Sequence, residues 1–394
     1  MIGSRISSES DAIFTIDNLP FTIGVYDEPA NPQPFPSMLP LQLGISTSTG
    51  LVSQLPSEIV RRFLALAYAR GSLLGTAMDD TPAGRRYAED FLAFLREVRD
   101  PNGASVLEIG AGRGYLLRRL QDLGAKVLGV EPGLANADNW KTHRVPVVGE
   151  FFPTPQITEH FDLIIGFALL EHVEQLGSFL DSVHRQLEPQ GCAIFAVPDC
   201  GQFIAQGDPS MLLHEHWHYF TAHSLKEVLR AAGFRIVHQR PAGYGSVLYM
   251  AATPTRDPRP IGSVSDEIQQ ARQFAAKCAR LRAWASNRIE SLAQQGVTLG
   301  VFVPGRALAL LPPHSDVRFF DDDAELLGRY FPPFHRAVEN RKALLQCPVD
   351  ELWILSRSFG PRLASELGAA GELNRTRIRT IVEIAGEASN EVAV

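Results

Sequence analysis

The stretch VLEIGAGRGYLLRRL, residues 106–120, carries the strongest structural signal in this chain of 394 residues. An apolar run leads into Gly110-Ala111-Gly112-Arg113-Gly114, and apolar residues at helical spacing follow at once. A strand, a glycine turn and a helix in this order are typical of α/β nucleotide-binding folds, because glycine permits a tight turn and lets a ligand lie against the backbone. The N-terminus of the helix adds free N–H groups that can meet an acceptor.

Two carboxylates accompany this glycine turn. Glu108 precedes it, and Glu131 ends the apolar run VLGVEP further along the chain. A carboxylate about 20 residues after such a turn, at the end of the second strand, can accept hydrogen bonds from both hydroxyls of a ribose. The glycine spacing is G-x-G-x-G, not the G-x-G-x-x-G of dinucleotide sites. We therefore predict a ligand that contains a ribose.

Strand-like and helical segments alternate on both sides of this turn. Strands separated by helices predict a mostly parallel sheet with helical crossovers. The strand-like runs between residues 104 and 254 are SVLEIGAG, AKVLGVEP, FDLIIGFA, CAIFAVPD, RIVHQR and SVLYMAATP, and those between 297 and 385 are TLGVFVPG, DVRFFDDD, ELWILSRS and RIRTIVEI. The sequence thus predicts two α/β units, joined by a long amphipathic helix from about Ser265 to Gln295.

Composition narrows the class of protein. A formal charge of −7 argues against binding to a nucleic-acid backbone, which favours a basic face. The start of the chain lacks a basic segment followed by an apolar core, and no apolar run reaches the roughly 18 residues of a membrane span. The four cysteines are scattered and are expected to be reduced thiols. We therefore expect a cytoplasmic protein with no nucleic-acid or membrane partner.

The glycine turn and its two carboxylates resemble those of the class I methyltransferases that use S-adenosylmethionine (SAM). The resemblance continues through FDLIIGFALLEHV (161–173), which is similar to the fourth strand of that family, and LEPQGCAIFAVPD (187–199), which is similar to the fifth. It implies an α/β fold with the class I Rossmann-like parallel sheet, and SAM as co-substrate. Two alternatives are a Rossmann-like domain for another nucleotide and a SAM fold that no longer catalyses.

The same resemblance implies which residues hold SAM. Glu108 and Gly110 are expected near its methionine part, Glu131 at its ribose and Phe151 near its adenine, with Phe167 and Ala168 beneath the sulfonium. The full implied set is Glu108, Gly110, Ala111, Gly112, Glu131, Pro132, Phe151, Phe167 and Ala168. Residues 166–169 read GFAL, unlike the [DN]-P-P-[FY] pattern of amino-methyltransferases that act on DNA bases or glutamine. This difference favours a small-molecule acceptor.

The stretch MLLHEHWHYF, residues 211–220, contains the zinc-protease pattern H-E-x-x-H. That pattern needs a long helix, whereas Pro209 lies just upstream and a new helix, capped by Thr221 or Ser224, begins just downstream. A loop or short strand is therefore expected. In an extended chain the three histidines would share one face and the glutamate would point the other way. A zinc site, a structural histidine cluster and a proton-transfer site are the three possible interpretations.

Proton transfer is the interpretation that we favour for this stretch. Moving a methyl group from a sulfonium to carbon requires a base that removes the C–H proton. The pKa of histidine lies near working pH, and a neighbouring carboxylate can orient the ring. Such a base typically contributes about 10² to 10⁴ in rate.

The pattern HEH…YF after a SAM-binding domain resembles the sugar C-methyltransferases that act on nucleotide-linked 4-keto deoxysugars. That family combines a small zinc-binding domain, the SAM domain and a C-terminal Rossmann-like domain. Further similar stretches are GYGSVLYMA (243–251), DELWILSRSFGPRLASEL, and VRFFDDDAELLGRYFPP (317–333) with Asp322, Asp323, Gly328, Tyr330 and Pro332. The resemblance implies that His216 is the base and that Glu215 supports it; the candidate catalytic residues are His216, Glu215, His214 and Tyr219.

This resemblance predicts four parts: a small N-terminal domain (1–56), the SAM-binding domain (57–255), a connector helix (256–296) and the C-terminal domain (297–394). The chain departs from the family at three places. Ser46 and Thr49 stand where a zinc-binding cysteine pair is expected, and no cysteine precedes Cys192, so we predict no zinc and no metal site. Leu213 stands where the family has a tyrosine, whose role Tyr68 or Tyr219 could take. The stretch VFVPGRALALL (301–311) lacks the family's lysine.

The sequence thus favours a SAM-dependent methyltransferase that acts on a small molecule in natural-product metabolism, such as antibiotic biosynthesis. The first choice is C-methylation next to a carbonyl, in a nucleotide-linked keto-sugar or a related intermediate. The alternatives are N- or O-methylation of another natural product, and a non-catalytic SAM-fold scaffold.

Overall fold

A computed structural model of the chain describes residues 10–21, 24–28, 34–69, 78–243, 246–256, 262–313, 315–357 and 359–390. Residues 244–245 of the stretch GYGSVLYMA lie outside these ranges. The chain divides into two compact units: Met1–Ala12, Leu43–Gly201 and Glu215–Gln269 form the first, and Ile13–Gln42, Gln202–His214 and Gln270–Val394 form the second. The four-part division by residue number stays a prediction. None of the helices in the described ranges is both long and apolar enough to span a membrane.

The first unit contains a seven-stranded sheet that confirms the predicted α/β class. Strands β6, β5, β4, β7 and β8 are parallel, whereas β11 is antiparallel to both β8 and β10. In sheet order the strands are β10 (Phe234–Pro241), β11 (Val247–Pro254), β8 (Leu187–Pro198), β7 (Phe161–Phe167), β4 (Ser105–Ile109), β5 (Lys126–Val130) and β6 (Val147–Val148). The carboxyl ends of the parallel strands therefore meet at one edge, where ligands of open α/β sheets bind.

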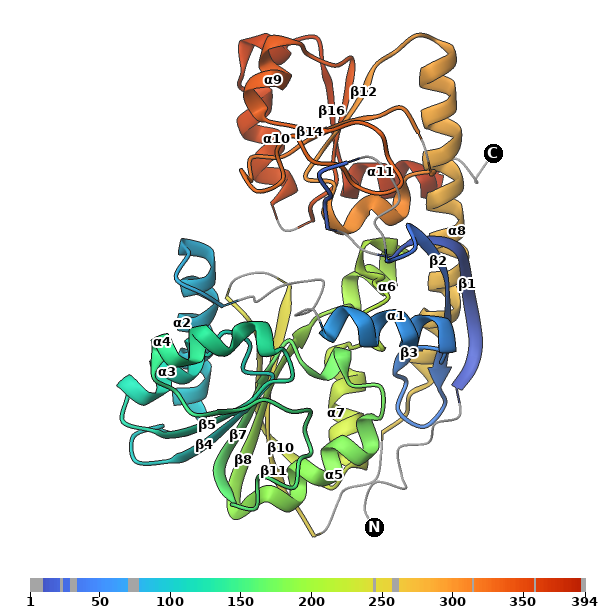
Figure 1. The fold of residues 1–394 in the computed structure, drawn as a ribbon. Coiled ribbons are helices and arrows are strands. Elements are labelled where there is room, and N and C mark those ends of the chain that lie inside the picture. Colours follow the sequence, from blue (N-terminus) through green and yellow to red (C-terminus); the bar gives the residue numbers. More distant parts are fainter. Residues whose placement is uncertain are drawn as a thin grey trace. The chain divides into compact units, whose positions relative to one another are not determined.

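Helices cover both faces of this sheet because its central strands are apolar on both sides (Figure 1). Leu107 and Ile164 pack on the side of α5 (Leu176–Gln186) and α7 (Ala222–Ala231). Val106 and Leu163 pack on the side of α2 (Pro82–Val98) and α3 (Tyr115–Asp122). Neighbouring residues of one strand thus pack in the two hydrophobic cores on opposite faces of the sheet. The shorter elements of this unit are α4 (Ala137–His143), η2 (Leu134–Asn136) and η3 (Leu170–His172).

The helix α7 begins as the sequence predicts. The Thr221 side chain accepts a hydrogen bond from the Ser224 N–H at 3.1 Å, and Ser224 Oγ accepts one from the Thr221 N–H at 2.9 Å. This capping box satisfies two backbone donors at the helix N-terminus.

A smaller sheet contains β1 (Ser10–Pro20), β2 (Met38–Ser46), β3 (Val52–Gln54) and β9 (His218–Tyr219), in that order, and α1 (Glu58–Ala69) follows β3. The turn between β2 and β3 includes both positions where the cysteine pair was expected. Ser46 Oγ accepts the Thr49 N–H at 3.3 Å, and the Ser46 carbonyl accepts the Gly50 N–H at 2.9 Å. Both side chains are buried. Hydrogen bonds therefore close this turn with residues that are poor zinc ligands.

The second unit contains a five-stranded sheet in which every pairing is parallel. Its order is β14 (Val338–Glu339), β13 (Arg318–Phe320), β12 (Leu299–Phe302), β15 (Glu351–Ile354) and β16 (Arg377–Thr380). The predicted long helix is α8 (Ser265–Gln294). One face of the sheet packs against α8, η5 (Gly305–Leu310) and α11 (Ile381–Asn390). The other face packs against α9 (Arg341–Gln346), α10 (Gly360–Gly368) and η6 (Gly371–Leu373). The remaining short elements are α6 (Gly201–Gln206) and η4 (Pro209–Met211).

Candidate functional site

The glycine turn after β4 has the conformation that its residues favour. Gly110, Gly112 and Gly114 have φ angles of +76°, +50° and +77°, which side-chain-bearing residues rarely adopt. The N–H groups of Gly110 and Ala111 donate to the Val130 carbonyl at 2.8 and 3.1 Å, so the turn is fixed against the end of β5. A Cβ atom on Gly110 would lie 3.2 Å from Leu169 Cδ1, which brings the turn next to the chain that leaves β7.

Glu131 directly follows β5 and holds the turn from the other side. Its Oε2 accepts the Gly112 N–H at 2.9 Å, and its Oε1 accepts the Gly133 N–H at 2.8 Å. Each carboxylate oxygen can accept a further hydrogen bond, so the oriented group could still receive two ribose hydroxyls. Pro132 is half-buried beside it.

Glu108 is buried in β4, and its surroundings favour the neutral carboxyl. Burial raises its pKa well above the ordinary value of a glutamate, and the negative charge of Glu131 raises it further. Among the described residues, Glu108 Oε2 has no hydrogen-bond partner. A buried carboxyl with a vacant acceptor and a raised pKa fits a ligand that brings a positive charge. The amino group of SAM has that charge.

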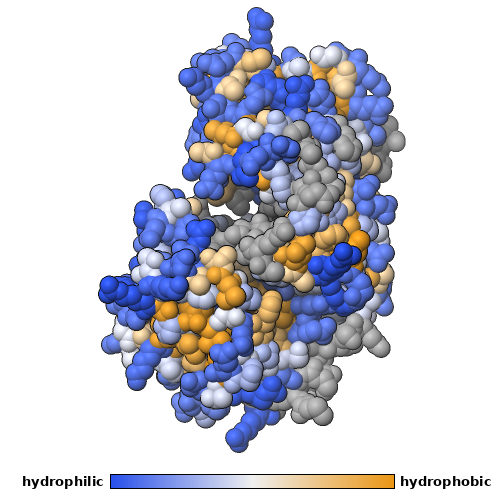
Figure 2. Space-filling model, viewed as in Figure 1, coloured by the Kyte–Doolittle hydropathy of each residue, from blue (hydrophilic) through white to orange (hydrophobic). Residues whose placement is uncertain are grey.

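The remaining predicted SAM contacts lie at the same edge or next to it. Ala168 has a φ angle of +49° just after β7, where its N–H donates to the Ala196 carbonyl at 2.9 Å. Phe167 meets Phe91 edge to face, with ring centroids 5.3 Å apart. Phe151 is 65% exposed, and its ring lies edge to face with Tyr68 at 6.4 Å. The face of this unit seen in Figure 2 carries a group of apolar residues.

The histidine-rich stretch does not form the helix of a zinc protease. Residues 214–215 form a turn, so the extended arrangement expected for the three histidines is wrong over its first half. Burial lowers the pKa of His214 to about 4, and its ring stacks on Phe21 at 5.6 Å. His218 Nδ1 lies 2.9 Å from Ser53 Oγ, and its Nε2 lies 3.0 Å from the Val173 carbonyl. Both nitrogens of His218 thus have structural partners.

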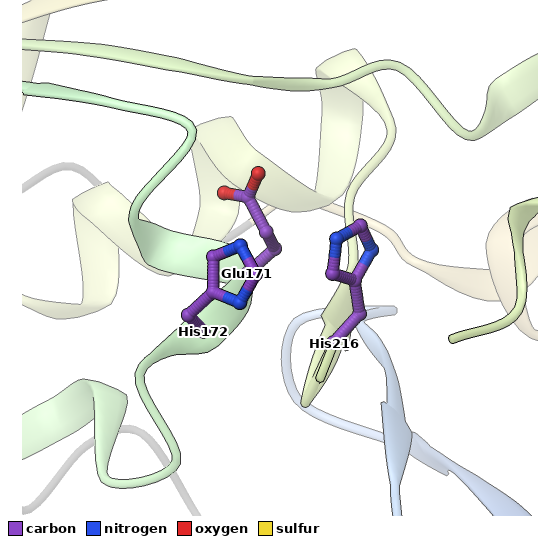
Figure 3. Close-up of side chains that lie close together, drawn as sticks. All are labelled: Glu171, His172 and His216. Carbon is purple, nitrogen blue, oxygen red and sulfur yellow. The ribbon is translucent and has the colours of Figure 1, made fainter. Parts of the chain in front are cut away.

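His216 instead joins two residues that the sequence analysis did not single out. Glu171 and His172, in η3 just after β7, point toward His216, which precedes β9 (Figure 3). One ligand-type atom of each residue lies within 4.8 Å of the others. The rings of His172 and His216 are 4.9 Å apart and nearly perpendicular. The signal available in the sequence was two polar residues directly after a buried strand of a parallel sheet.

Hydrogen bonds fix the two segments that carry this cluster. The Trp217 N–H donates to the Glu171 carbonyl at 2.6 Å, and His172 Nδ1 lies 3.0 Å from the Glu215 carbonyl. Because a carbonyl can only accept, Nδ1 of His172 is the donor in this contact, and Nε2 is the ring nitrogen that can act as an acceptor when the ring is neutral. Of the predicted catalytic residues, Tyr219 is buried in β9 with its ring 6.2 Å from that of His216.

Tyr68 connects the cluster with the glycine turn. Its hydroxyl lies 3.4 Å from His172 Nδ1. Burial raises the pKa of Tyr68 far above its ordinary value, and the carboxylates of Glu215, Glu171 and Glu131 raise it further. Because Glu131 orients the turn and Glu171 belongs to the cluster, both parts lie within electrostatic reach of one buried phenol. Tyr68 is therefore near both parts.

Comparison with known proteins supports this assignment of the fold. Residues 82–239 match the family model described as a methyltransferase domain. The chain is 26% identical over 260 residues to the C-methyltransferase NovU of Streptomyces niveus, which covers 59% of this chain and 61% of NovU. It is 35% identical over 114 residues to a ubiquinone biosynthesis O-methyltransferase of Bradyrhizobium diazoefficiens, which covers 26% of this chain and 44% of that protein.

A DhpI–SAH complex matches 52% of the chain and all of its own length, with 20% identity and a TM-score of 0.39. The chain spans only about three fifths of NovU and less than half of the O-methyltransferase. The matched family and the sheet topology identify a methyltransferase domain of the class I, SAM-dependent type. The family model extends from α2 to β10 and thus includes the glycine turn, Glu131 and the cluster residues Glu171, His172 and His216.

Proposed function

We propose that this protein transfers a methyl group from SAM to a small-molecule acceptor, at a carbon next to a carbonyl. The observation that carries the proposal is the cluster of Glu171, His172 and His216 beside the glycine turn. Buried groups that can accept a proton thus lie next to the expected position of the methyl donor. The similarity to a protein named a C-methyltransferase supports carbon as the acceptor atom.

SAM, when bound, supplies the methyl group as an electrophile on a sulfonium. Glu131 accepts the ribose hydroxyls, since its carboxylate is already held in place by two backbone N–H groups. Glu108 receives the amino group, which gives the vacant Oε2 a charged donor. Phe151 is the candidate cover for the adenine, and Phe167 with Ala168 is the candidate floor beneath the sulfonium.

His216 takes the proton that must leave the acceptor carbon. The carbon next to a carbonyl becomes nucleophilic as its proton departs to a base. Its electron pair would then form the new C–CH₃ bond while the S–CH₃ bond breaks and leaves its electrons on the sulfur. His216 is buried, and a carboxylate in its cluster, that of Glu171, can stabilise the imidazolium that forms. Glu215 remains the candidate supporting residue from the sequence. Tyr68, whose hydroxyl lies 3.4 Å from His172 Nδ1, is the candidate for the role of the tyrosine that Leu213 replaces.

O-methylation is the second candidate, because several O-methyltransferases match part of the chain. In that reaction His216 would remove a proton from oxygen. The acceptor would then show no exchange of a C–H proton with solvent. The two reactions are therefore separated by isotope exchange.

The decisive experiment incubates a nucleotide-linked 4-keto deoxysugar with the protein and SAM in heavy water and follows the product by mass spectrometry. We expect one added methyl group on carbon, with solvent deuterium exchange at that carbon that disappears in His216→Ala. The exposed His160 supplies the control, since His160→Ala should behave as the wild type. Methylation at oxygen, or exchange that persists in His216→Ala, would contradict the proposal.

Binding of S-adenosylhomocysteine tests the co-substrate assignment separately. Glu131→Ala removes two anchors of the glycine turn and the acceptor for the ribose, so we expect about a 100-fold loss of affinity, from charged hydrogen bonds of about 1.5–3 kcal/mol each. Isothermal titration calorimetry measures this loss directly. Equal affinity in the variant and the wild type would show that Glu131 does not hold the ribose. Weak binding to the wild type would favour a non-catalytic scaffold.

A further inference from the structure

The cluster of Glu171, His172 and His216 has the composition of a metal site. Two imidazoles and one carboxylate form the ligand set that non-haem iron, zinc, manganese and cobalt share. All three side chains point inward to one space in Figure 3, and their ligand atoms lie within 4.8 Å of one another. Zinc–ligand bonds of about 2.0–2.1 Å separate tetrahedral ligands by about 3.3 Å. Rotamer adjustments of about an ångström would therefore close the site.

The backbone already holds the ligands in register. The Trp217 N–H donates to the Glu171 carbonyl, and Nε2 of His218 lies 3.0 Å from the Val173 carbonyl. These contacts tie the segment after β7 to the segment before β9 on either side of the cluster. Because the two segments need not be brought together by the ion, binding requires only the side chains to move.

The protonation of His172 also fits a ligand. Its Nδ1–H faces the Glu215 carbonyl at 3.0 Å, which leaves the electron pair on Nε2. Metal-binding histidines almost always donate their second ring N–H to a carbonyl or carboxylate in this way, since the contact fixes the tautomer and the ring orientation. Glu215 would thus act through its main chain as the outer partner of the site.

Burial of Glu171 and His216 gives the ion an energetic reason to bind. Glu171 is 1% exposed and His216 is 2% exposed. The low-dielectric interior strengthens the attraction between a buried carboxylate and a divalent cation, and the same ion can take the imidazole electron pairs. Magnesium and calcium prefer oxygen ligands, so the two imidazoles favour zinc, cobalt or iron.

We propose that Glu171, His172 and His216 bind one divalent transition-metal ion, with zinc as the expected occupant. The sequence analysis predicted no metal site, because it searched for cysteines and for the H-E-x-x-H spacing. The ligands proposed here come from two segments that neither pattern connects. The site is also distinct from the turn at Ser46 and Thr49, where the resembling family has its cysteines.

The ion would compete with proton transfer, a consequence that rests on the proposed function. The electron pair of His216 that binds the metal is the pair that would accept the proton. Zinc should therefore inhibit methyl transfer, and chelation should restore it.

Cobalt provides a direct readout of the site that does not depend on activity. The full-length protein, stripped with a chelator, is titrated with Co²⁺, and visible absorption bands of imidazole-ligated cobalt are followed until one equivalent has bound. We expect Glu171→Gln, His172→Asn and His216→Asn each to weaken Co²⁺ binding by at least about tenfold, the loss typical even of outer partners. These near-isosteric variants limit unfolding, which circular dichroism checks, and the exposed His160→Ala is the matched control.

Three results would support the site. Zinc should compete for the cobalt signal, elemental analysis should find one equivalent of zinc, and both should be lost in the three variants. Absence of a cobalt spectrum in the wild type, or an unchanged spectrum in folded His216→Asn, would overturn it. If methyl transfer rises with added zinc, the competition with His216 is refuted, although the ligands stand. A protein that binds cobalt at this cluster but methylates no keto-sugar contradicts the proposed function alone.

Discussion

Each unit of this protein buries one glutamate in a strand of its parallel sheet, and the two glutamates have opposite surroundings. Glu108 in β4 is 4% exposed and Glu351 in β15 is 2% exposed. Burial and the charge of Glu131 raise the pKa of Glu108. Burial also opposes ionisation of Glu351, but hydrogen bonds from Arg288 and Trp353 and the charges of Arg288 and Arg379 outweigh it and lower its pKa.

The contacts explain the difference. Glu351 Oε2 accepts from Arg288 Nη2 at 2.5 Å, Oε1 accepts from Trp353 Nε1 at 2.8 Å, and Arg379 lies 3.7 Å away. Glu108 Oε2 has no such partner among the described residues. Loss of a fully paired buried carboxylate destabilises the fold because its partners keep their charges, whereas a buried carboxyl with an unsatisfied oxygen is available to a ligand. The comparison therefore assigns structure to Glu351 and binding to Glu108.

The largest expected effect comes from breaking the paired glutamate. Glu351→Ala leaves the charges of Arg288 and Arg379 without their buried partner, and such a loss costs about 3–5 kcal/mol. We expect the free energy of unfolding of the second unit to fall by about that amount, as measured by urea denaturation. S-adenosylhomocysteine affinity of the folded protein should not change. A loss below about 1 kcal/mol would remove the distinction between the two glutamates.

The next effect concerns the unpaired glutamate and has the reverse pattern. Glu108→Gln keeps the shape of the side chain but removes its charge, so the ammonium of the ligand loses a charged hydrogen bond of about 1.5–3 kcal/mol. We expect S-adenosylhomocysteine affinity to fall about 10- to 100-fold by calorimetry. The unliganded variant should be at least as stable as the wild type, because a buried acid whose Oε2 has no hydrogen-bond partner among the described residues has been replaced. A variant that binds normally would exclude Glu108 from the ligand site.

The two glutamates also mark how far the sequence could be interpreted. Glu108 and Glu131 were predictable because a strand, a glycine turn and a second strand fix their positions over a short segment. The role of Glu351 was not, since its partners come from α8 and β16, far away in the chain.

The cluster shows the same limit. His216 was singled out from its local pattern, but Glu171 and His172 lie 45 and 44 residues earlier, and only the pairing of their segments joins them. A search for polar residues at the ends of predicted parallel strands would have found Glu171 and His172. It would not have shown that His214 packs on Phe21 while His216 joins the cluster, because the neighbours of each ring are set only in the folded chain.

The smallest effect, and the sharpest test of the comparison, is the pH dependence of stability. A carboxyl whose pKa is raised by folding binds more protons in the folded state, so the stability it confers is full below the unfolded pKa, near 4.5, and falls as pH rises toward the folded pKa. A carboxyl whose pKa is lowered by folding confers stability that is present above the unfolded pKa and is lost as pH falls through the folded pKa. Glu108 belongs to the first case and Glu351 to the second.

Urea denaturation between pH 3 and 8 should therefore separate Glu108→Gln from Glu351→Gln. The first variant should gain stability relative to the wild type as pH rises above about 4.5. The second should show its full loss of stability above that pH and should approach the wild type as pH falls below it. Binding should reverse the first trend, because the ammonium of S-adenosylhomocysteine favours ionised Glu108 and its binding releases a proton. Calorimetry in buffers of different ionisation enthalpy detects that proton. Parallel pH trends in the two variants would mean that Glu108 has a partner after all, and the site at the glycine turn would lose its charged contact.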